Sequence, residues 1–214
     1  MSDVRTFETP HGPGRLHVSR ARRPRATLLV SHGAGGGIDA PDLLALARDL
    51  PRNGVTVVRL EQPWRVAGRK IAGPPASLDE GLRAGASALR TRTPLVVGGR
   101  SAGARSAARC ARSLGAVGCL ALSFPLHPPG RPEKSRADEL LGSGVATLVV
   151  QGERDAFGRP EEFPPDDGTR HLVIVPEADH GLKVPKRAVL DADEVDALVV
   201  EATLEWLVRE VVGG

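Results

Sequence analysis

The sequence contains very few aromatic and sulfur-containing residues. It has no tyrosine, two tryptophans, four phenylalanines, one methionine and two cysteines among 214 residues. Two cysteines are too few for a disulfide framework, so an apolar core has to hold the fold together. With so few aromatic residues, that core is expected to consist mostly of Val, Leu and Ala. A nucleic-acid-binding surface built on interleaved aromatic and basic side chains is excluded for the same reason.

Long apolar segments are missing as well. No stretch is long enough to cross a membrane, and the first residues do not form the apolar segment of a signal peptide. The net charge is only +3, and the basic residues are scattered apart from one cluster just before an expected strand: Arg20, Arg22, Arg23 and Arg25. We interpret this cluster as a solvent-exposed loop. These features predict a cytoplasmic protein without a membrane or nucleic-acid partner.

Short apolar runs alternate with helical patterns along most of the chain. The expected strands are 4–9, 15–19, 26–31, 54–60, 95–97, 117–124, 146–151 and 171–175, and the expected helices are 41–50, 77–90, 102–114, 137–141 and 193–211. The first two strands predict an antiparallel hairpin at the sheet edge, and Ser77 with Glu80 predicts a capping box. The whole pattern predicts one α/β domain over residues 1–214, with a mostly parallel sheet, helices on both faces and no lid domain.

One short segment shapes the functional prediction. Residues 95–97 are an apolar run typical of a buried strand, and a helical pattern begins at Ala102. Between them, Gly99–Gly103 matches G-x-S-x-G, with Ser101 at its centre. In this motif a tight turn from strand to helix exposes the serine hydroxyl above the sheet. The alternative is an ordinary turn that happens to carry a serine at the start of a helix.

Two further reactive side chains follow other strands. Asp155 comes after the strand 146–151, and His180 comes after the strand 171–175. Because ligands of parallel α/β sheets bind beyond the carboxyl ends of the strands, we expect both to lie near Ser101. The order Ser, Asp, His along the chain is that of α/β-hydrolases. The predicted roles are Ser101 as nucleophile, His180 as general base and Asp155 as the group that orients the imidazole. The N–H groups of Ala34 and Ala102 are the predicted oxyanion hole.

The other candidates fit these roles less well. Of the remaining histidines, His32 is expected to shape the glycine loop 33–37, and the Pro-rich segment 125–130 contains His127 before any candidate acid. We interpret that segment as a rim of the pocket rather than a partner-binding motif. Asp166 and Asp167 belong to a polar loop, and Asp179 is too close to His180 along the chain to reach its ring. The glycine loop lacks the residues of a P-loop and of a dinucleotide fingerprint. No metal-ligand spacing is present.

Five short motifs occur in order along the chain. They are SHGAGG at 31–36, GGRSAG at 98–103, FPLHPPG at 124–130, QGERDAFG at 151–158 and ADHG at 178–181. Together they resemble the α/β-hydrolase superfamily over nearly the whole chain, and within it a small lidless, dienelactone-hydrolase-like branch. That branch includes the hydrolase-like domains of a testis-expressed protein and of a histone-acetyltransferase complex subunit.

The resemblance implies an α/β-hydrolase core with Ser101, Asp155 and His180 as the catalytic triad. It implies no particular substrate, and dienelactone hydrolases proper use a cysteine where this chain has Ser101. The first hypothesis is therefore a cofactor-free and metal-free serine hydrolase that acts on a small ester, thioester or similar acyl substrate. The second is a catalytically silent scaffold that binds a partner or small ligand. Arg100, beside the nucleophile, is either a cation for an anionic substrate or a salt-bridged structural residue.

Overall fold

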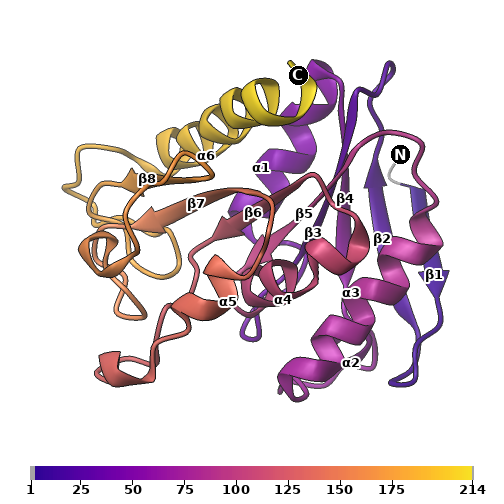
Figure 1. The fold of residues 1–214 in the computed structure, drawn as a ribbon, viewed down its shortest axis with the longest axis horizontal. Helices are drawn as coiled ribbons and strands as arrows, with labels where there is room; N and C mark the ends of the chain where they lie inside the picture. The colour runs from indigo at the N-terminus through magenta and orange to yellow at the C-terminus, as the bar shows by residue number, and fades with distance from the viewer. Residues whose placement is uncertain (1–2, 214) are drawn as a thin grey trace.

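The computed structural model describes residues 3–213, which form one eight-stranded sheet with helices on both sides (Figure 1). The strands are β1 (Asp3–Phe7), β2 (Gly14–Ser19), β3 (Ala26–Ser31), β4 (Val55–Glu61), β5 (Leu95–Arg100), β6 (Gly118–Leu122), β7 (Ala146–Gly152) and β8 (Arg170–Val175). The α-helices are α1 (Pro41–Asp49), α2 (Pro63–Val66), α3 (Pro75–Leu89), α4 (Ala102–Cys110), α5 (Ala137–Leu141) and α6 (Ala192–Leu207). Short 3-10 turns extend α1 and α4, and a π-helical turn at Val208–Val212 extends α6.

The strand order is β1-β2-β4-β3-β5-β6-β7-β8. Strands β3 to β8 are parallel, and β2 pairs antiparallel with both β1 and β4. Because β3 lies between β4 and β5, the order reverses there along the chain. In sheets of this kind the carboxyl ends of the two strands at such a reversal border a crevice where ligands bind. The loop after β3 and the turn after β5 are therefore expected to border a ligand site.

Two apolar layers hold the helices against the sheet (Figure 1). Helices α1 and α6 cover one face, with Trp206 as the largest fully buried side chain, and α3, α4 and α5 cover the other, where Phe124 is fully buried. Every residue of β3 and β6 is buried, which explains why both sequences are mostly apolar. The two polar residues of β3, Thr27 and Ser31, are hydrogen-bonded. Each buried Leu or Val contributes roughly 1.5–3 kcal/mol relative to an exposed one, so the sheet is a rigid platform for the loops at its ends.

The structure confirms the predicted fold class and most element positions. Strand β3 and helix α5 have the predicted bounds, and β1 and β2 form the predicted antiparallel hairpin. The capping box at Ser77 is wrong. Helix α3 begins two residues earlier, at Pro75, and the Ser77 hydroxyl donates a hydrogen bond to the carbonyl of Pro74. Proline already has the backbone angle of a first helical residue, so the helix starts there.

Other details also differ from the prediction. Strands β1 and β6 end at Phe7 and Leu122, each two residues before the predicted end. The four-residue helix α2 was not expected, and α6 begins one residue before the predicted start. In α6 the carboxylate of Asp191 accepts from Glu194 N, and the Glu194 carboxylate accepts from Asp191 N, which forms a capping box. Among the helices of residues 3–213, none combines the length and the apolar character needed to span a lipid bilayer.

Candidate active site

The turn between β5 and α4, which we call the elbow, is tight and strained. Ser101 has φ +53° and ψ −113°, a conformation that side-chain-bearing residues rarely adopt, and its N–H donates to Leu122 O at 2.9 Å. A Cβ atom on Gly99 would lie 2.6 Å from the carbonyl oxygen of Ser31 and from the carbonyl carbon of Gly103. Glycine is therefore required where the turn presses against β3, and the close packing fixes the direction of the Ser101 side chain.

Two hydrogen bonds connect the three predicted triad residues. Ser101 Oγ lies 2.9 Å from His180 Nε2, and His180 Nδ1 lies 2.7 Å from Asp155 Oδ2. A carboxylate oxygen only accepts hydrogen bonds, so Nδ1 carries the ring proton and Nε2 is free to accept from the hydroxyl. The geometry is therefore that of a nucleophile, a base and an orienting group within hydrogen-bonding reach of one another.

Asp155 is completely buried, and polar groups surround its carboxylate. Oδ2 accepts a second hydrogen bond from Gln151 Nε2 at 2.8 Å, and Oδ1 accepts one from the N–H of Phe157 at 2.8 Å. A buried charge is costly unless it is paired and hydrogen-bonded, and these donors supply the partners. Neither Gln151 nor Phe157 has a predicted role, although both lie in the 151–158 motif, which is the signal that could have identified them.

A stacked aromatic ring holds His180 in addition to its hydrogen bond with Asp155. The ring of Phe157 stacks on its imidazole, with centroids 4.2 Å apart and planes at 30°. The loop that carries His180 also packs closely on β7, since a Cβ atom on Gly152 would lie 2.6 Å from the carbonyl oxygens of Ala178 and Asp179. The imidazole is thus confined between a hydrogen bond and a ring face, while about a quarter of its side chain stays open to solvent.

The glycine loop after β3 forms one wall of a cavity of about 320 Å³ that also reaches Ser101 and His180. The cavity is lined by residues 33–37, among them Ala34, and by Ala40, Pro41, Arg100, Ser101, His180, Gly181 and Lys183. Ala102 is the first residue of α4, and the first N–H groups of a helix have no partner within it. Among residues 3–213, neither Ala34 N–H nor Ala102 N–H donates a hydrogen bond to another protein group. Both predicted oxyanion donors are therefore free.

His32 shapes the glycine loop, as predicted. Its Nδ1–H donates to Gly33 O at 2.9 Å, and its Nε2 accepts from the N–H of Gln62 at 3.1 Å. Burial lowers the pKa of His32, which agrees with a neutral ring that donates on one side and accepts on the other. The ring also meets Trp64 edge to face, at a centroid distance of 5.3 Å. His32 therefore supports the loop and does not contact the triad.

The structure separates the remaining candidates from the site. The Asp179 carboxylate accepts from the N–H groups of Gly181 and Lys183 and so caps its own loop. Asp166 and Asp167 are exposed and pair with His171 and Arg170. The interpretation of the Pro-rich segment as a pocket rim is wrong for the cavity beside Ser101, which no residue of 125–130 lines. The segment instead supports the Asp155 loop, where the N–H of His127 donates to Phe157 O at 2.9 Å.

Both cysteines are free and are buried in the apolar layer between the sheet and helices α3, α4 and α5. Burial raises the pKa of Cys110 to about 11 and that of Cys119 to about 12, so both thiols stay protonated near neutral pH. A protonated thiol is a poor nucleophile, and neither cysteine competes with Ser101 for that role. Within residues 3–213, no group of three or more His, Cys, Asp or Glu side chains is arranged to hold a metal ion.

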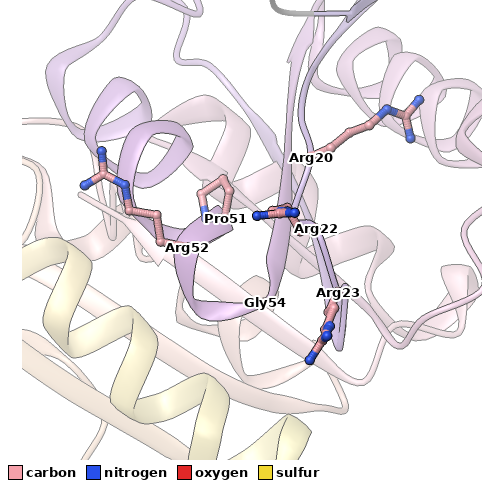
Figure 2. Close-up of a pocket in the computed structure, with 6 residues that line it drawn as sticks. All are labelled: Arg20, Arg22, Arg23, Pro51, Arg52 and Gly54. Carbon is pink, nitrogen blue, oxygen red and sulfur yellow. The ribbon is translucent and has the colours of Figure 1, made fainter.

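The arginine cluster lies at the opposite end of the strands. Arg20, Arg22, Arg23 and Arg52 line a cleft of about 590 Å³ beside the amino-terminal ends of β3 and β4 (Figure 2). The predicted solvent-exposed cluster, Arg20, Arg22, Arg23 and Arg25, is exposed at all four positions, and so is Arg52. Arg20 pairs with Asp3 at 2.7 Å. Figure 2 shows the guanidinium groups pointing in different directions. The cleft is large, but its charged groups do not converge.

Comparisons with known proteins agree with this architecture. A family model described as an alpha/beta hydrolase domain matches residues 24–208. An α/β serine hydrolase without a lid from Xanthomonas campestris is 21% identical, with a TM-score of 0.72 over 98% of this chain and 95% of that chain. A dienelactone hydrolase from Anabaena variabilis is 15% identical, with a TM-score of 0.73 over 99% of this chain and 98% of that chain.

A third similar structure is Est1E from Butyrivibrio proteoclasticus, which is 15% identical, with a TM-score of 0.70 over 96% of this chain and 99% of that chain. At these identities the structural likeness establishes the fold. The connection between β6 and β7 contains only a 3-10 turn and the five-residue α5, in keeping with a lidless member. The prediction of a hydrolase is confirmed at the level of the family, because the chain belongs to the alpha/beta hydrolase family.

Proposed function

We propose that the protein is a serine hydrolase that cleaves small esters, thioesters or related acyl compounds through an acyl-enzyme. Ser101 Oγ attacks the carbonyl carbon while its proton passes to His180 Nε2, and Asp155 stabilises the imidazolium that forms. The N–H groups of Ala34 and Ala102 donate to the oxyanion of the tetrahedral intermediate. Removing one such donor typically costs about 3–4 kcal/mol of transition-state stabilisation.

The second half of the reaction returns the enzyme to its starting state. When the intermediate collapses, the bond to the leaving alcohol or thiol breaks, and that group takes the proton from Nε2. Ser101 is then acylated. A water molecule gives a proton to His180 Nε2 and attacks the acyl carbon. The bond between the acyl carbon and Ser101 Oγ then breaks, Nε2 returns the proton to Oγ, and the carboxylic acid is released.

One observation carries this proposal: the unbroken chain of hydrogen bonds from the strained Ser101 through His180 to the buried Asp155, at 2.9 and 2.7 Å. The volume of the cavity beside Ser101 supports a small substrate. A cavity of about 320 Å³, with the glycine loop as one wall, suits a short acyl group better than a long chain.

The test is covalent labelling with a fluorophosphonate, followed by mass spectrometry of the adduct. We expect wild type to be labelled on Ser101, and Ser101→Ala to lose labelling and at least about 10⁴-fold in kcat. Ser106→Ala is the matched control, because Ser106 is a fully buried serine on α4, the helix that follows Ser101 directly. It should label like wild type.

An ester panel identifies the substrate range and the alternative. Short-chain 4-nitrophenyl esters test the small-acyl proposal. Methyl ferulate is included because Est1E from Butyrivibrio proteoclasticus, a structural relative, has been solved with ferulic acid bound. A folded wild type that is never labelled, and hydrolyses every ester at the same rate as Ser101→Ala, would instead be the catalytically silent scaffold.

A further inference from the structure

Arg100 connects three parts of the active site. It is the residue before Ser101, so its backbone belongs to the elbow. Its Nη2 donates to the carbonyl oxygen of His180 at 2.8 Å, and its Nη1 donates to Asp42 Oδ2 at 3.0 Å. Asp42 lies in the first turn of α1, the helix that follows the glycine loop. One guanidinium therefore spans the elbow, the His180 loop and the start of α1.

The ion pair at the centre of this arrangement is well buried. The side chain of Asp42 is 2% exposed and that of Arg100 is 14% exposed. Burial raises the pKa of Asp42, and the charge of Arg100 opposes the rise. Removing one member of a buried pair leaves the other charge without compensation, so the two side chains hold each other in place. With one guanidinium arm fixed by Asp42, the other has a defined direction, toward His180.

The backbone that Arg100 holds needs such support. The His180 loop contains Glu177 at φ +56° and Leu182 at φ +53°, both in the left-handed region that non-glycine residues rarely occupy. The start of the loop is tied to the Asp155 side by the hydrogen bond from Arg154 N to Ala178 O at 2.8 Å. The bond from Arg100 ties it to the Ser101 side. These two hydrogen bonds therefore hold the loop that carries the His180 imidazole, which contacts Ser101.

We propose that Arg100 and Asp42 are positioning residues that hold the backbone of His180 so that its imidazole lies over Ser101. Each guanidinium arm has a protein partner, and Asp42 balances the charge of Arg100, although Arg100 also lines the cavity beside Ser101. The competing role, binding of an anionic substrate group, is what the paired substrates below test. This inference rests on the proposed hydrolase function. A displacement of about 1 Å between reacting groups costs on the order of 10²-fold in rate, which sets the scale of the expected effect.

The primary test is Arg100→Lys, with Arg109→Lys as the matched control. Lysine keeps the charge but lacks the planar fork that reaches two acceptors at once. Arg109 lies on α4, is similarly buried, and pairs with Asp79 and Glu139 away from the cavity. We expect Arg100→Lys to lower kcat by about 10- to 100-fold with KM within about threefold, and Arg109→Lys to leave both within about threefold of wild type.

A pair of substrates separates positioning from substrate binding. 4-Nitrophenyl acetate is neutral, whereas the mono-4-nitrophenyl ester of succinic acid carries a carboxylate. If Arg100 positions His180, kcat falls equally for both esters. A rise in KM confined to the anionic ester, with kcat unchanged, would overturn the proposal, and so would a wild-type kcat for both.

Asp42→Asn keeps the test decisive if Arg100→Lys does not fold. Asparagine preserves the shape and an acceptor oxygen but removes the charge that fixes the guanidinium. We expect a smaller loss of kcat than in Arg100→Lys, again without a change in KM. Circular dichroism and thermal unfolding establish that each variant is folded. A folded Asp42→Asn with wild-type kcat would count against the proposal.

A spectroscopic readout distinguishes failure of this inference from failure of the proposed function. The proton on His180 Nδ1, hydrogen-bonded to Asp155, is expected as a downfield NMR resonance that is absent from His180→Gln. It should shift or broaden in Arg100→Lys and Asp42→Asn but persist in Arg109→Lys. If wild type is neither labelled nor active on any ester, the proposed function fails. The resonance still tests whether Arg100 and Asp42 position His180. An unchanged resonance in Arg100→Lys would overturn the positioning proposal.

Discussion

The two ends of the parallel strands differ in a way that cavity size does not indicate. At the amino-terminal end, the arginine-lined cleft measures about 590 Å³ (Figure 2), whereas the cavity beside Ser101 measures about 320 Å³. The smaller cavity has the ordered polar groups: Asp155 is fully buried, and hydrogen bonds link it to His180 and Ser101. In the larger cleft the charged side chains are exposed and point apart.

The physical reason lies in the cost of burying polar groups. An exposed arginine keeps its hydration and can sit on any surface, so a cleft lined with such residues needs no special explanation. A buried carboxylate such as Asp155 persists only because Gln151, Phe157 and His180 donate to it. A group of buried polar side chains that hydrogen-bond to one another is therefore better evidence of a functional site than the volume of a cavity.

The sharpest test of this contrast is Asp155→Asn. The amide that replaces the carboxylate can favour the wrong imidazole tautomer, and an equivalent change in a Ser-His-Asp site costs about 10⁴-fold in kcat. Asp179→Asn, one residue from His180 in the sequence, is the matched control and should change kcat by less than about tenfold. Steady-state kinetics on a short-chain ester measures both. Equal effects in the two variants would remove Asp155 from the mechanism.

The next effect concerns stability at the same end of the sheet. Gly99→Ala would bring a Cβ atom within 2.6 Å of backbone atoms of Ser31 and Gly103, so we expect a loss of about 3 kcal/mol or more in the free energy of unfolding. Gly36→Ala, in the glycine loop, meets nothing within 4 Å and should stay within about 0.5 kcal/mol of wild type. Urea unfolding compares them. A stable Gly99→Ala would mean that the elbow is not closely packed.

The smallest effect is expected in the arginine cleft. Among residues 3–213, neither Arg22 nor Arg23 forms a salt bridge, and both are exposed. The double variant Arg22→Ala/Arg23→Ala should leave kcat within about twofold of wild type and the free energy of unfolding within about 0.5 kcal/mol for each substitution. A large loss of ester hydrolysis in this variant would break the comparison, since the cleft would then contribute to the reaction.

Local sequence patterns were sufficient for much of the fold. The mostly apolar run at Ala26–Ser31 gave the bounds of β3, because a strand buried on both faces accepts few polar residues; its two, Thr27 and Ser31, are hydrogen-bonded. The pattern at Ser77 failed because two competing start signals lie two residues apart, and Pro75 begins the helix. The predicted roles of Ser101, Asp155 and His180 remain to be tested, although all three lie where the strand ends indicated.

The residues around the triad were harder to predict. Gln151 and Phe157 act on Asp155 and His180 through contacts that depend on how the β7 and β8 loops fold over each other. Arg100 was ambiguous in the sequence, since a cation beside a nucleophile is compatible with either role. Its partner Asp42 lies 58 residues away along the chain.

The sequence by itself determined the order of strands and helices and the presence of a serine, an acid and a histidine after three of the strands. Short-range periodicity and turn chemistry encode those features, because they depend on neighbouring residues. Only the tertiary structure decided that Gln151 and Phe157 hold the Asp155 carboxylate, and that Asp42 neutralises Arg100. Such choices depend on which loops pack together at the end of the sheet, and packing joins residues that no local pattern relates.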